Sequence, residues 1–205
     1  MKVDSATIKK RYNRIAPYFD AMEAIMEGLF FKTWRKKLWS KVEGYHILEV
    51  GVGTGKNFEF YPTEARLTAI DFSEKMLKQA LHNKHRKGVS VALDLMDIQS
   101  LAFADNSFDT VIGSFVFCSV PLPVKGLKEL YRVCRPGGQL LLLEHVISSN
   151  TFIAKLMNTI NPVILTLIGA NINRNTVKNV KACGFSSVRI DERSGPIIKL
   201  IEARK

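Results

Sequence analysis

Residues 49–55 read Glu49-Val50-Gly51-Val52-Gly53-Thr54-Gly55, and this short stretch decides the fold. The apolar run His46–Val50 leads into it, and its composition predicts a buried strand. Closely spaced glycines let the backbone turn tightly and approach a ligand, while a helix that follows would present free N–H groups. We therefore expect a strand, a ligand-binding loop and a short helix, in that order.

The same alternation continues to the end of the chain. Further apolar segments predict strands at residues 67–70, 90–95, 110–117, 139–146, 188–191 and 197–203. Helical patterns lie between several of them, at about residues 74–85, 124–133 and 175–183. Apolar strands separated by helices are typical of a parallel sheet that is covered on both faces. We expect an α/β, Rossmann-like domain with a mostly parallel, seven-stranded sheet.

The first 41 residues differ from this pattern. Apolar residues recur there at helical spacing, and Pro17 must break or kink the helix. We expect residues 1–41 to form a helical lid or membrane-facing segment, and residues 42–205 to form the ligand-binding domain. Residues 147–172 also lie outside the alternation and are rich in Met, Ile, Leu and Phe. The two segments are expected to cover an apolar pocket, with Met22, Met26, Met157 and Ile160 in its wall.

The positive charge of the chain is concentrated at its ends. The formal net charge is +11; residues 1–41 hold 10 Lys/Arg against 4 Asp/Glu, and residues 172–205 hold 8 against 3. Such ends could meet an anionic membrane, a nucleic acid or an anionic substrate, or could simply be solvated. Phe30, Phe31, Trp34 and Trp39 lie among the N-terminal lysines, which favours a membrane surface.

No apolar run is long enough to span a bilayer, and residues 1–20 do not resemble a secretory signal. We therefore expect a cytoplasmic protein that can lie peripherally at the inner face of a membrane. Cys118, Cys134 and Cys183 are far apart and lack metal-ligand spacing. We expect reduced, buried thiols and no metal site.

Asp71 extends the glycine loop into a larger site. It ends the second predicted strand, 20 residues after Gly51, where a carboxylate can accept hydrogen bonds from both hydroxyls of a ribose. The loop spacing is Gly-x-Gly-x-Gly, whereas a dinucleotide site has Gly-x-Gly-x-x-Gly. In addition, no tyrosine has a lysine four residues later, as the short-chain group of nicotinamide oxidoreductases would have. The spacing thus disfavours an oxidoreductase.

Further motifs complete a resemblance. Residues 48–144 resemble class I S-adenosylmethionine-dependent methyltransferases of the group that methylates ubiquinone and menaquinone precursors. The motifs that carry it, besides the loop, are residues 71–77, 96–99, 103–109 and 130–138. Ala104 departs from the group, which usually has proline there. The resemblance implies S-adenosylmethionine as cofactor, with S-adenosylhomocysteine as its product.

The resemblance also implies which residues contact the cofactor. It places Glu49 near the methionine amino group and Asp71 at the ribose. The other residues surround the methionine (Gly51, Gly53 and Gly55), the sulfonium (Ser114 and Val116) and the adenine (Phe72, Met76, Asp97 and Ile98). Core packing is the competing interpretation of Phe72 and Met76.

The acceptor is less clear, because two resemblances point to different chemistries. The glycine loop, Tyr61-Pro62 and the N-terminal segment 12–20 resemble small bacterial phosphatidylethanolamine N-methyltransferases. Residues 57–62, 118–120 and 144–146 resemble methyltransferases that act on alkyl thiols. We expect a small lipophilic acceptor, with a phospholipid amine as first choice and a thiol or a quinone precursor as alternatives. A non-catalytic cofactor-binding module is the alternative from another class.

An amine or a thiol must lose a proton when it is methylated. His145, at the carboxyl end of the fifth predicted strand, is the candidate base, because an imidazole titrates near neutral pH. Tyr12 and Tyr18 could offer ring faces to a cationic amine. Nucleic acid is not an expected partner, because the Pro-Pro-Tyr and Pro-Cys motifs of nucleic-acid methyltransferases are missing. The oligomeric state stays open.

Overall fold

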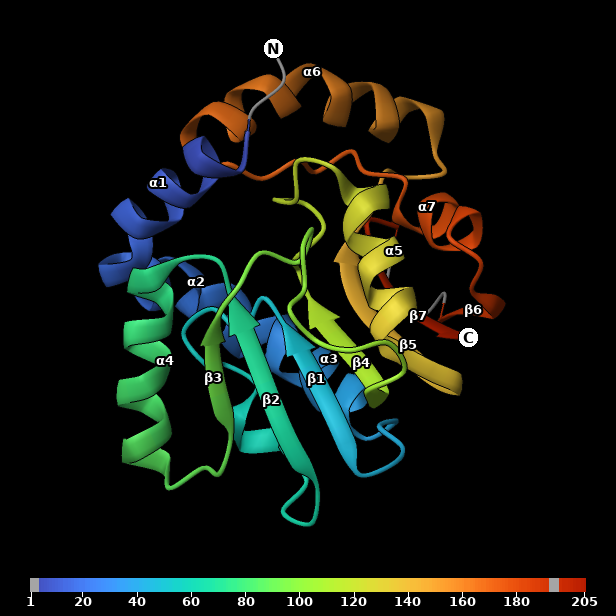
Figure 1. Ribbon diagram of the computed structural model, residues 1–205. Helices are drawn as coiled ribbons and strands as arrows, with labels where there is room; N and C mark the ends of the chain where they lie inside the picture. Colours follow the sequence, from blue (N-terminus) through green and yellow to red (C-terminus); the bar gives the residue numbers. More distant parts are fainter. Residues whose placement is uncertain (1–3, 192–195) are drawn as a thin grey trace.

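A seven-stranded sheet in the order β3-β2-β1-β4-β5-β7-β6 forms the centre of the molecule (Figure 1). The computed structural model describes residues 4–191 and 196–205. Its strands are β1 (His46–Val50), β2 (Arg66–Asp71), β3 (Ala92–Leu95), β4 (Phe108–Ser114), β5 (Cys134–His145), β6 (Ser186–Asp191) and β7 (Ile198–Arg204). β1 to β5 pair in parallel, and β7 is antiparallel to both β5 and β6. The seven strands and the mostly parallel sheet confirm the prediction.

Helices cover both faces of the sheet, as predicted. α5 (Pro123–Val133) and α7 (Thr176–Ala182) pack on one face, and α3 (Lys32–Trp39) and α4 (Glu74–Lys87) pack on the other. Neighbouring strand residues alternate between the two cores: Leu140 and Leu142 belong to the first, and Leu141 and Leu143 to the second. All four leucines are fully buried. Cys118, Cys134 and Cys183 are unpaired and buried, as expected.

The N-terminal segment forms a broken helix. α1 (Ser5–Ile15) ends before Pro17, which lies in the 3-10 turn η1 (Ala16–Tyr18); α2 (Phe19–Met26) and the π-helical turn η2 (Glu27–Phe31) then lead into α3. The break at Pro17 is therefore confirmed. However, α3 does not belong to a lid, because Leu38 and Trp39 are buried in the core beneath the sheet. Residues 1–3 of the predicted lid lie outside the described residues.

Two segments depart from the predicted elements. Between β1 and β2, where we expect a short helix, the described structure has turns and the 3-10 helix η3 (Phe58–Phe60), and no α-helix. Residues 151–167 form a long helix, α6 (Thr151–Leu167), which retains Pro162 in its interior. α6 and α1 lie across the carboxyl ends of the parallel strands (Figure 1). Among residues 4–191 and 196–205, no helix is long and apolar enough to cross a membrane.

β4 is shorter at its end than predicted. Phe115 has a φ of 59°, a left-handed conformation that turns the chain out of the sheet. The buried carboxylate of Glu144 stabilises the turn, because its Oε1 accepts hydrogen bonds from the N–H groups of Val116 (2.9 Å) and Phe117 (3.1 Å). As a result, the residues after Ser114 leave the strand and face the carboxyl edge of the sheet.

Candidate active site

A cavity of about 370 Å³ lies at the carboxyl ends of the parallel strands. In the sheet, β1 lies between β2 and β4, so the strand order reverses there. Ligands of open α/β sheets bind at such a reversal, and the volume is in the range of small-molecule sites. Residues that follow β1, β2, β3 and β4 line one side of the cavity, and residues of α1, α2, η2 and α6 line the other.

The glycine loop forms part of the floor. Gly51 has a φ of 66°, and a Cβ atom there would lie 2.5 Å from Cγ2 of Val116, so a side chain would not fit. Gly53 has a φ of 56° and open space where its side chain would be. Gly55 lies outside the cavity lining and packs against the ring of Phe58 instead. In this structure Gly55 shapes the loop, and its contact with the ligand stays a prediction.

Asp71 joins the loop to the end of β2. Its Oδ2 accepts a hydrogen bond from the N–H of Gly53 (2.9 Å), and its Oδ1 accepts one from the N–H of Ser73 (2.8 Å). Each carboxylate oxygen can accept more than one hydrogen bond, so both can still bind a hydroxyl. Burial raises the pKa of Asp71 to about 6. At neutral pH its carboxylate is thus mostly charged and faces the cavity.

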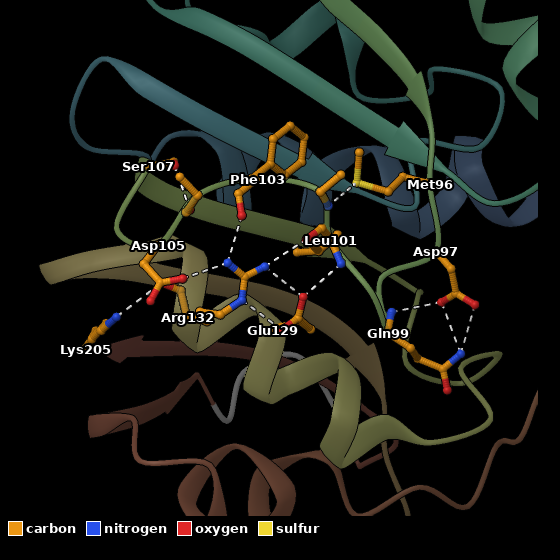
Figure 2. Close-up of polar contacts among 12 residues, drawn as sticks. Met96, Asp97, Gln99, Leu101, Phe103, Asp105, Ser107, Glu129, Arg132 and Lys205 are labelled. Atoms are coloured by element: carbon orange, nitrogen blue, oxygen red, sulfur yellow. Dashed lines mark hydrogen bonds and ion pairs between the residues drawn. The ribbon is translucent and has the colours of Figure 1, made fainter.

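The segment after β3 brings a second carboxylate to the cavity. Asp97 accepts hydrogen bonds from the backbone N–H (2.8 Å) and the side-chain Nε2 of Gln99 (Figure 2). Gln99 in turn donates to Oγ of Ser5 at the start of α1 (2.7 Å). Ile98, Phe72 and Met76 also line the cavity. The four residues expected around an adenine therefore all line this cavity.

Glu49 does not reach the cavity. Its carboxylate is fully buried and accepts hydrogen bonds from Asn57 Nδ2 and from the Tyr61 hydroxyl. Burial raises its pKa to about 7. Asn57 and Tyr61 bind its carboxylate oxygens, so in this conformation Glu49 holds the segment after the glycine loop, and its contact with the methionine amino group stays a prediction. The sequence could not predict these two hydrogen bonds, because they form only when the segment between β1 and β2 consists of turns and not of an α-helix.

Arg35 is a site residue that the sequence reasoning missed. It is only 5% exposed and lines the cavity. Its Nε pairs with Glu27 (3.0 Å), and its NH1 donates to Ser114 Oγ (2.8 Å) and Asn57 Oδ1 (3.2 Å). One signal was present in the sequence: Arg35 stands four residues after Phe31 and four before Trp39, on the apolar face of the helix.

Comparison with known proteins identifies the family. Residues 48–142 match a family model described as a methyltransferase domain. The phosphatidylethanolamine N-methyltransferase of Cereibacter sphaeroides is 39% identical over 147 residues, which cover 71% of this chain and 70% of that protein. Thiol S-methyltransferase TMT1B of Homo sapiens is 30% identical over 198 residues, which cover 88% of this chain and 79% of that protein. A crystal structure from Thermotoga maritima, described as an S-adenosylmethionine-dependent methyltransferase and possible histamine N-methyltransferase, shares the fold with a TM-score of 0.73. The two are 18% identical, and the match covers 96% of this chain and 99% of that chain.

The chain is an S-adenosylmethionine-dependent methyltransferase. The resemblance inferred from its motifs and the class I fold are thereby confirmed. The cavity also fits the cofactor on structural grounds: the open space at Gly53 admits a ligand close to the backbone, and Asp71 retains acceptor capacity for a ribose.

The methyltransferase brings His145 and Tyr12 to the cavity but not Tyr18. His145 lines the cavity from the end of β5, with its ring 4.9 Å from that of Phe115. Tyr12 reaches it from α1 and contacts the Phe72 ring edge-to-face at 5.8 Å. Tyr18 lies on the 3-10 turn with its side chain 69% exposed, outside the lining. The turn at Pro17 directs Tyr18 to solvent, so the structure gives it no place in the site.

The lid wall of the methyltransferase is apolar, but its residues differ from those expected. Met22, Met26 and Ile160 are exposed and Met157 is buried elsewhere. The wall consists of Phe19, Phe31, Ile164, Ile168 and Ile172. The helical phase explains the difference: α2 and α6 turn other residues of the same composition toward the cavity.

Arg132 of α5 holds the segment that carries Asp97 (Figure 2). Its guanidinium donates to the carbonyl oxygens of Leu101 (2.9 Å) and Phe103 (2.7 Å), and to Asp105 and Glu129. Glu129 also accepts from the N–H of Leu101 (2.8 Å). Arg132, in the motif at residues 130–138, thus supports the segment that carries Asp97 from outside the cavity.

Replacing Arg132 by Met should therefore loosen this segment. We expect the free energy of unfolding to fall by about 1–3 kcal/mol, since hydrogen bonds to a charged group are lost but the side chain is about a third exposed. Denaturant unfolding measures the change, with Arg86→Met on the exposed end of α4 as control. Equal stability of the two variants would contradict this role.

Proposed function

We propose that the methyltransferase methylates the amine of phosphatidylethanolamine at a membrane surface. The observation that carries the proposal is a cavity that joins a cofactor-binding floor to an apolar lid wall. A lipid acceptor would place its headgroup between the floor and the lid helices, and its first apolar atoms against the wall. The similarity to the phosphatidylethanolamine N-methyltransferase of Cereibacter sphaeroides supports this choice of acceptor.

The lid helices are apolar on their outer sides too, which supports a membrane surface. On α2 and η2, Ile25 is 74% and Leu29 is 66% exposed. On α6, Phe152 is 80% and Leu167 is 63% exposed. Exposed apolar residues gathered on elements that border a cavity are typical of a lipid or protein contact.

Not all of the aromatic residues that we expected to face the membrane are exposed. Phe31 and Trp39 are buried, whereas Phe30 is 51% exposed. Several of the basic residues are already paired, such as Lys41 with Glu202 (2.7 Å) and Lys32 with Glu59 (2.8 Å). The proposed membrane contact therefore relies on the apolar residues of α2, η2 and α6 more than on the basic ends.

The proposed cofactor site uses the residues that line the floor. Asp71 would hold the ribose, Asp97 with Ile98 and Phe72 the adenine, and Gly51 and Gly53 the methionine chain. When bound, S-adenosylmethionine supplies a methyl group on a sulfonium; the acceptor lone pair takes this methyl group as the electrons of the C–S bond return to sulfur. Positioning of the two reactants provides most of the rate in such a transfer. With both reactants bound, the lid helices would exclude water from the reacting groups.

His145 is proposed as the base that takes the proton of the acceptor. Burial lowers its pKa below the ordinary value of 6.5, so its imidazole is neutral at pH 7 and can accept a proton. The rings of Phe31 and Phe115 hold it in place. Tyr12 has a raised pKa because of burial and keeps its hydroxyl proton, so its ring face and hydroxyl can contact the headgroup.

The role of His145 predicts a pH dependence. A His145→Gln variant should lose about 10²–10⁴-fold in kcat/KM, the usual contribution of a general base. In the wild type, kcat/KM for the acceptor should fall as the pH drops below 6.5, because the imidazole becomes protonated; the variant should lack this limb. S-adenosylmethionine is kept saturating at every pH, so that protonation of Asp71 does not lower the rate through cofactor binding. His82→Gln, exposed on α4, is the control. A variant with the wild-type pH profile would exclude His145 as the base.

An acceptor panel tests the proposed function. Wild-type enzyme is incubated with methyl-labelled S-adenosylmethionine and, separately, phosphatidylethanolamine vesicles, an alkyl thiol and a demethylated quinone. We expect labelled phospholipid as the main product. Labelled thiol or quinone without labelled lipid would refute the proposal.

Alkyl thiol S-methylation is the second candidate, favoured by one observation. The similarity to human thiol S-methyltransferase TMT1B extends over 88% of the chain, farther than the similarity to the phospholipid enzyme. It therefore includes parts of the lid. A thiol is neutral before it reacts, whereas an amine enters as a cation, and the panel separates the two.

A further inference from the structure

Three carboxylates and two cations lie together where α2 and η2 approach the glycine loop. Arg35 is paired with Glu27 (3.0 Å), and Lys56 with Asp20 (3.4 Å). The third carboxylate, Glu23, lines the cavity; its Oε2 is buried and has no hydrogen-bond partner among the described residues. Within the described part of the chain, the cluster therefore holds one more negative than positive charge.

A buried carboxylate oxygen without a hydrogen-bond partner among the described residues has an energetic cost. Buried charges are stable when paired, and an unsatisfied buried acceptor calls for an explanation. Burial raises the pKa of Glu23, and the positive charges of Arg35 and Lys56 offset this only in part, because the carboxylates of Glu27 and Asp20 lie nearby as well. A cation that enters the cavity with a ligand would complete the cluster.

We infer that Glu23 binds the ammonium group of the acceptor and thereby selects amines over neutral acceptors, an inference that rests on the phospholipid N-methylation proposed above. The residue would act as a positioning and specificity group: it holds the nitrogen in the cavity but takes no part in bond making. A thiol or a quinone brings no such charge and gains nothing from Glu23.

The position of Glu23 favours the acceptor over the cofactor as the source of the ammonium. Glu23 enters the cavity from α2, four residues after Phe19, which belongs to the apolar lid wall. Its charge acts on Tyr12 and Cys118, two further residues of the lining. Asp71 and Asp97, the residues proposed for the ribose and the adenine, lie instead at the ends of β2 and β3. The methionine ammonium of the cofactor at the glycine loop is the competing cation, and the cofactor-affinity measurement described below separates the two.

Glu23 would also serve successive rounds of methylation. Before a transfer the ammonium gives one proton to His145, and the free nitrogen lone pair then forms the new N–C bond. The methylated nitrogen is again a cation, so the same carboxylate can hold it for the next round. With each round, the acceptor nitrogen has one N–H donor fewer.

A Glu23→Gln variant removes the charge and keeps the shape of the side chain. Glu64→Gln, on the exposed loop before β2, removes the same charge as a control. Three quantities are compared: kcat/KM with a short-chain phosphatidylethanolamine and with an alkyl thiol; the affinity for this lipid in the presence of S-adenosylhomocysteine, by calorimetry; and the affinity for S-adenosylhomocysteine alone.

For Glu23→Gln we expect kcat/KM and affinity for the lipid to fall by about 30-fold or more, the usual result of removing one partner of a buried charge pair. Thiol turnover and the affinity for S-adenosylhomocysteine should stay within about threefold of the wild-type values, less than 1 kcal/mol. Unchanged lipid affinity would overturn the inference, as would an equal loss of S-adenosylhomocysteine affinity, which would assign Glu23 to the cofactor. A wild type that does not methylate the lipid refutes the proposed function instead.

Discussion

An Asp71→Ala variant is expected to lose most of its affinity for the cofactor. Two charge-assisted hydrogen bonds to the ribose are removed, each of about 1.5–3 kcal/mol, so Kd should rise by about 10²–10⁴-fold. The loss of the acceptor for the N–H of Gly53 adds to the effect, because the glycine loop is then held less firmly. Calorimetry with S-adenosylhomocysteine measures the change.

Two controls accompany this measurement. Asp94→Ala, on the exposed side of β3, removes a carboxylate from a strand residue and should leave Kd unchanged. Asp71→Asn keeps the shape of the side chain and a single carbonyl acceptor, and should give an intermediate Kd if the variant is folded. Wild-type affinity in Asp71→Ala would show that the cofactor lies elsewhere.

Arg35→Met is expected to have the largest effect on stability. The substitution leaves Glu27, whose side chain is 16% exposed, without its cation, and it removes a donor from Ser114 and from Asn57. Breaking a buried pair in this way costs about 3–5 kcal/mol. Denaturant unfolding should show this loss in the free energy of unfolding.

A double variant tests whether the unpaired charge of Glu27 causes the loss of stability. Adding Glu27→Gln to Arg35→Met removes the unpaired charge, so part of the lost stability should return, because a neutral pair is cheaper to bury than a lone carboxylate. If the single variant is as stable as the wild type, or if the double variant is less stable than the single one, the Arg35–Glu27 pair does not have the role given to it here.

The sequence was sufficient for the sheet and for the position of the cavity. Period and composition located all seven strands, and the glycine loop with Asp71 marked the point where the strand order reverses. His145 could be placed correctly because the end of a parallel strand always lies at the same edge of the sheet. These features depend on local pattern and on topology, both of which are readable from the chain.

Other features depend on contacts that no local pattern contains. The cover of Glu49 by Asn57 and Tyr61 arises because the segment after β1 forms turns instead of an α-helix. The end of β4 is determined by Glu144, a residue 28 positions away from Val116. In α6, Pro162 and the polar residues around it concealed a helix that contributes Ile164 to the cavity.

The acceptor itself could not be predicted from the motifs, because they belong to the cofactor. The acceptor contacts come from the lid, where helical phase decides which residue faces the cavity. Composition indicated an apolar wall there, but the structure was needed to replace Met22 and Met26 by Phe19 and Phe31, and to identify Glu23.

The most direct test of the account is a crystal structure of the protein with S-adenosylhomocysteine and a short-chain phosphatidylethanolamine. The account predicts that the ribose hydroxyls contact Asp71, that the headgroup nitrogen lies within hydrogen-bond distance of Glu23, and that the lipid chains leave along Ile164 and Ile168. A cofactor bound away from the glycine loop, or a headgroup nitrogen bound away from Glu23 and the lid, would contradict it.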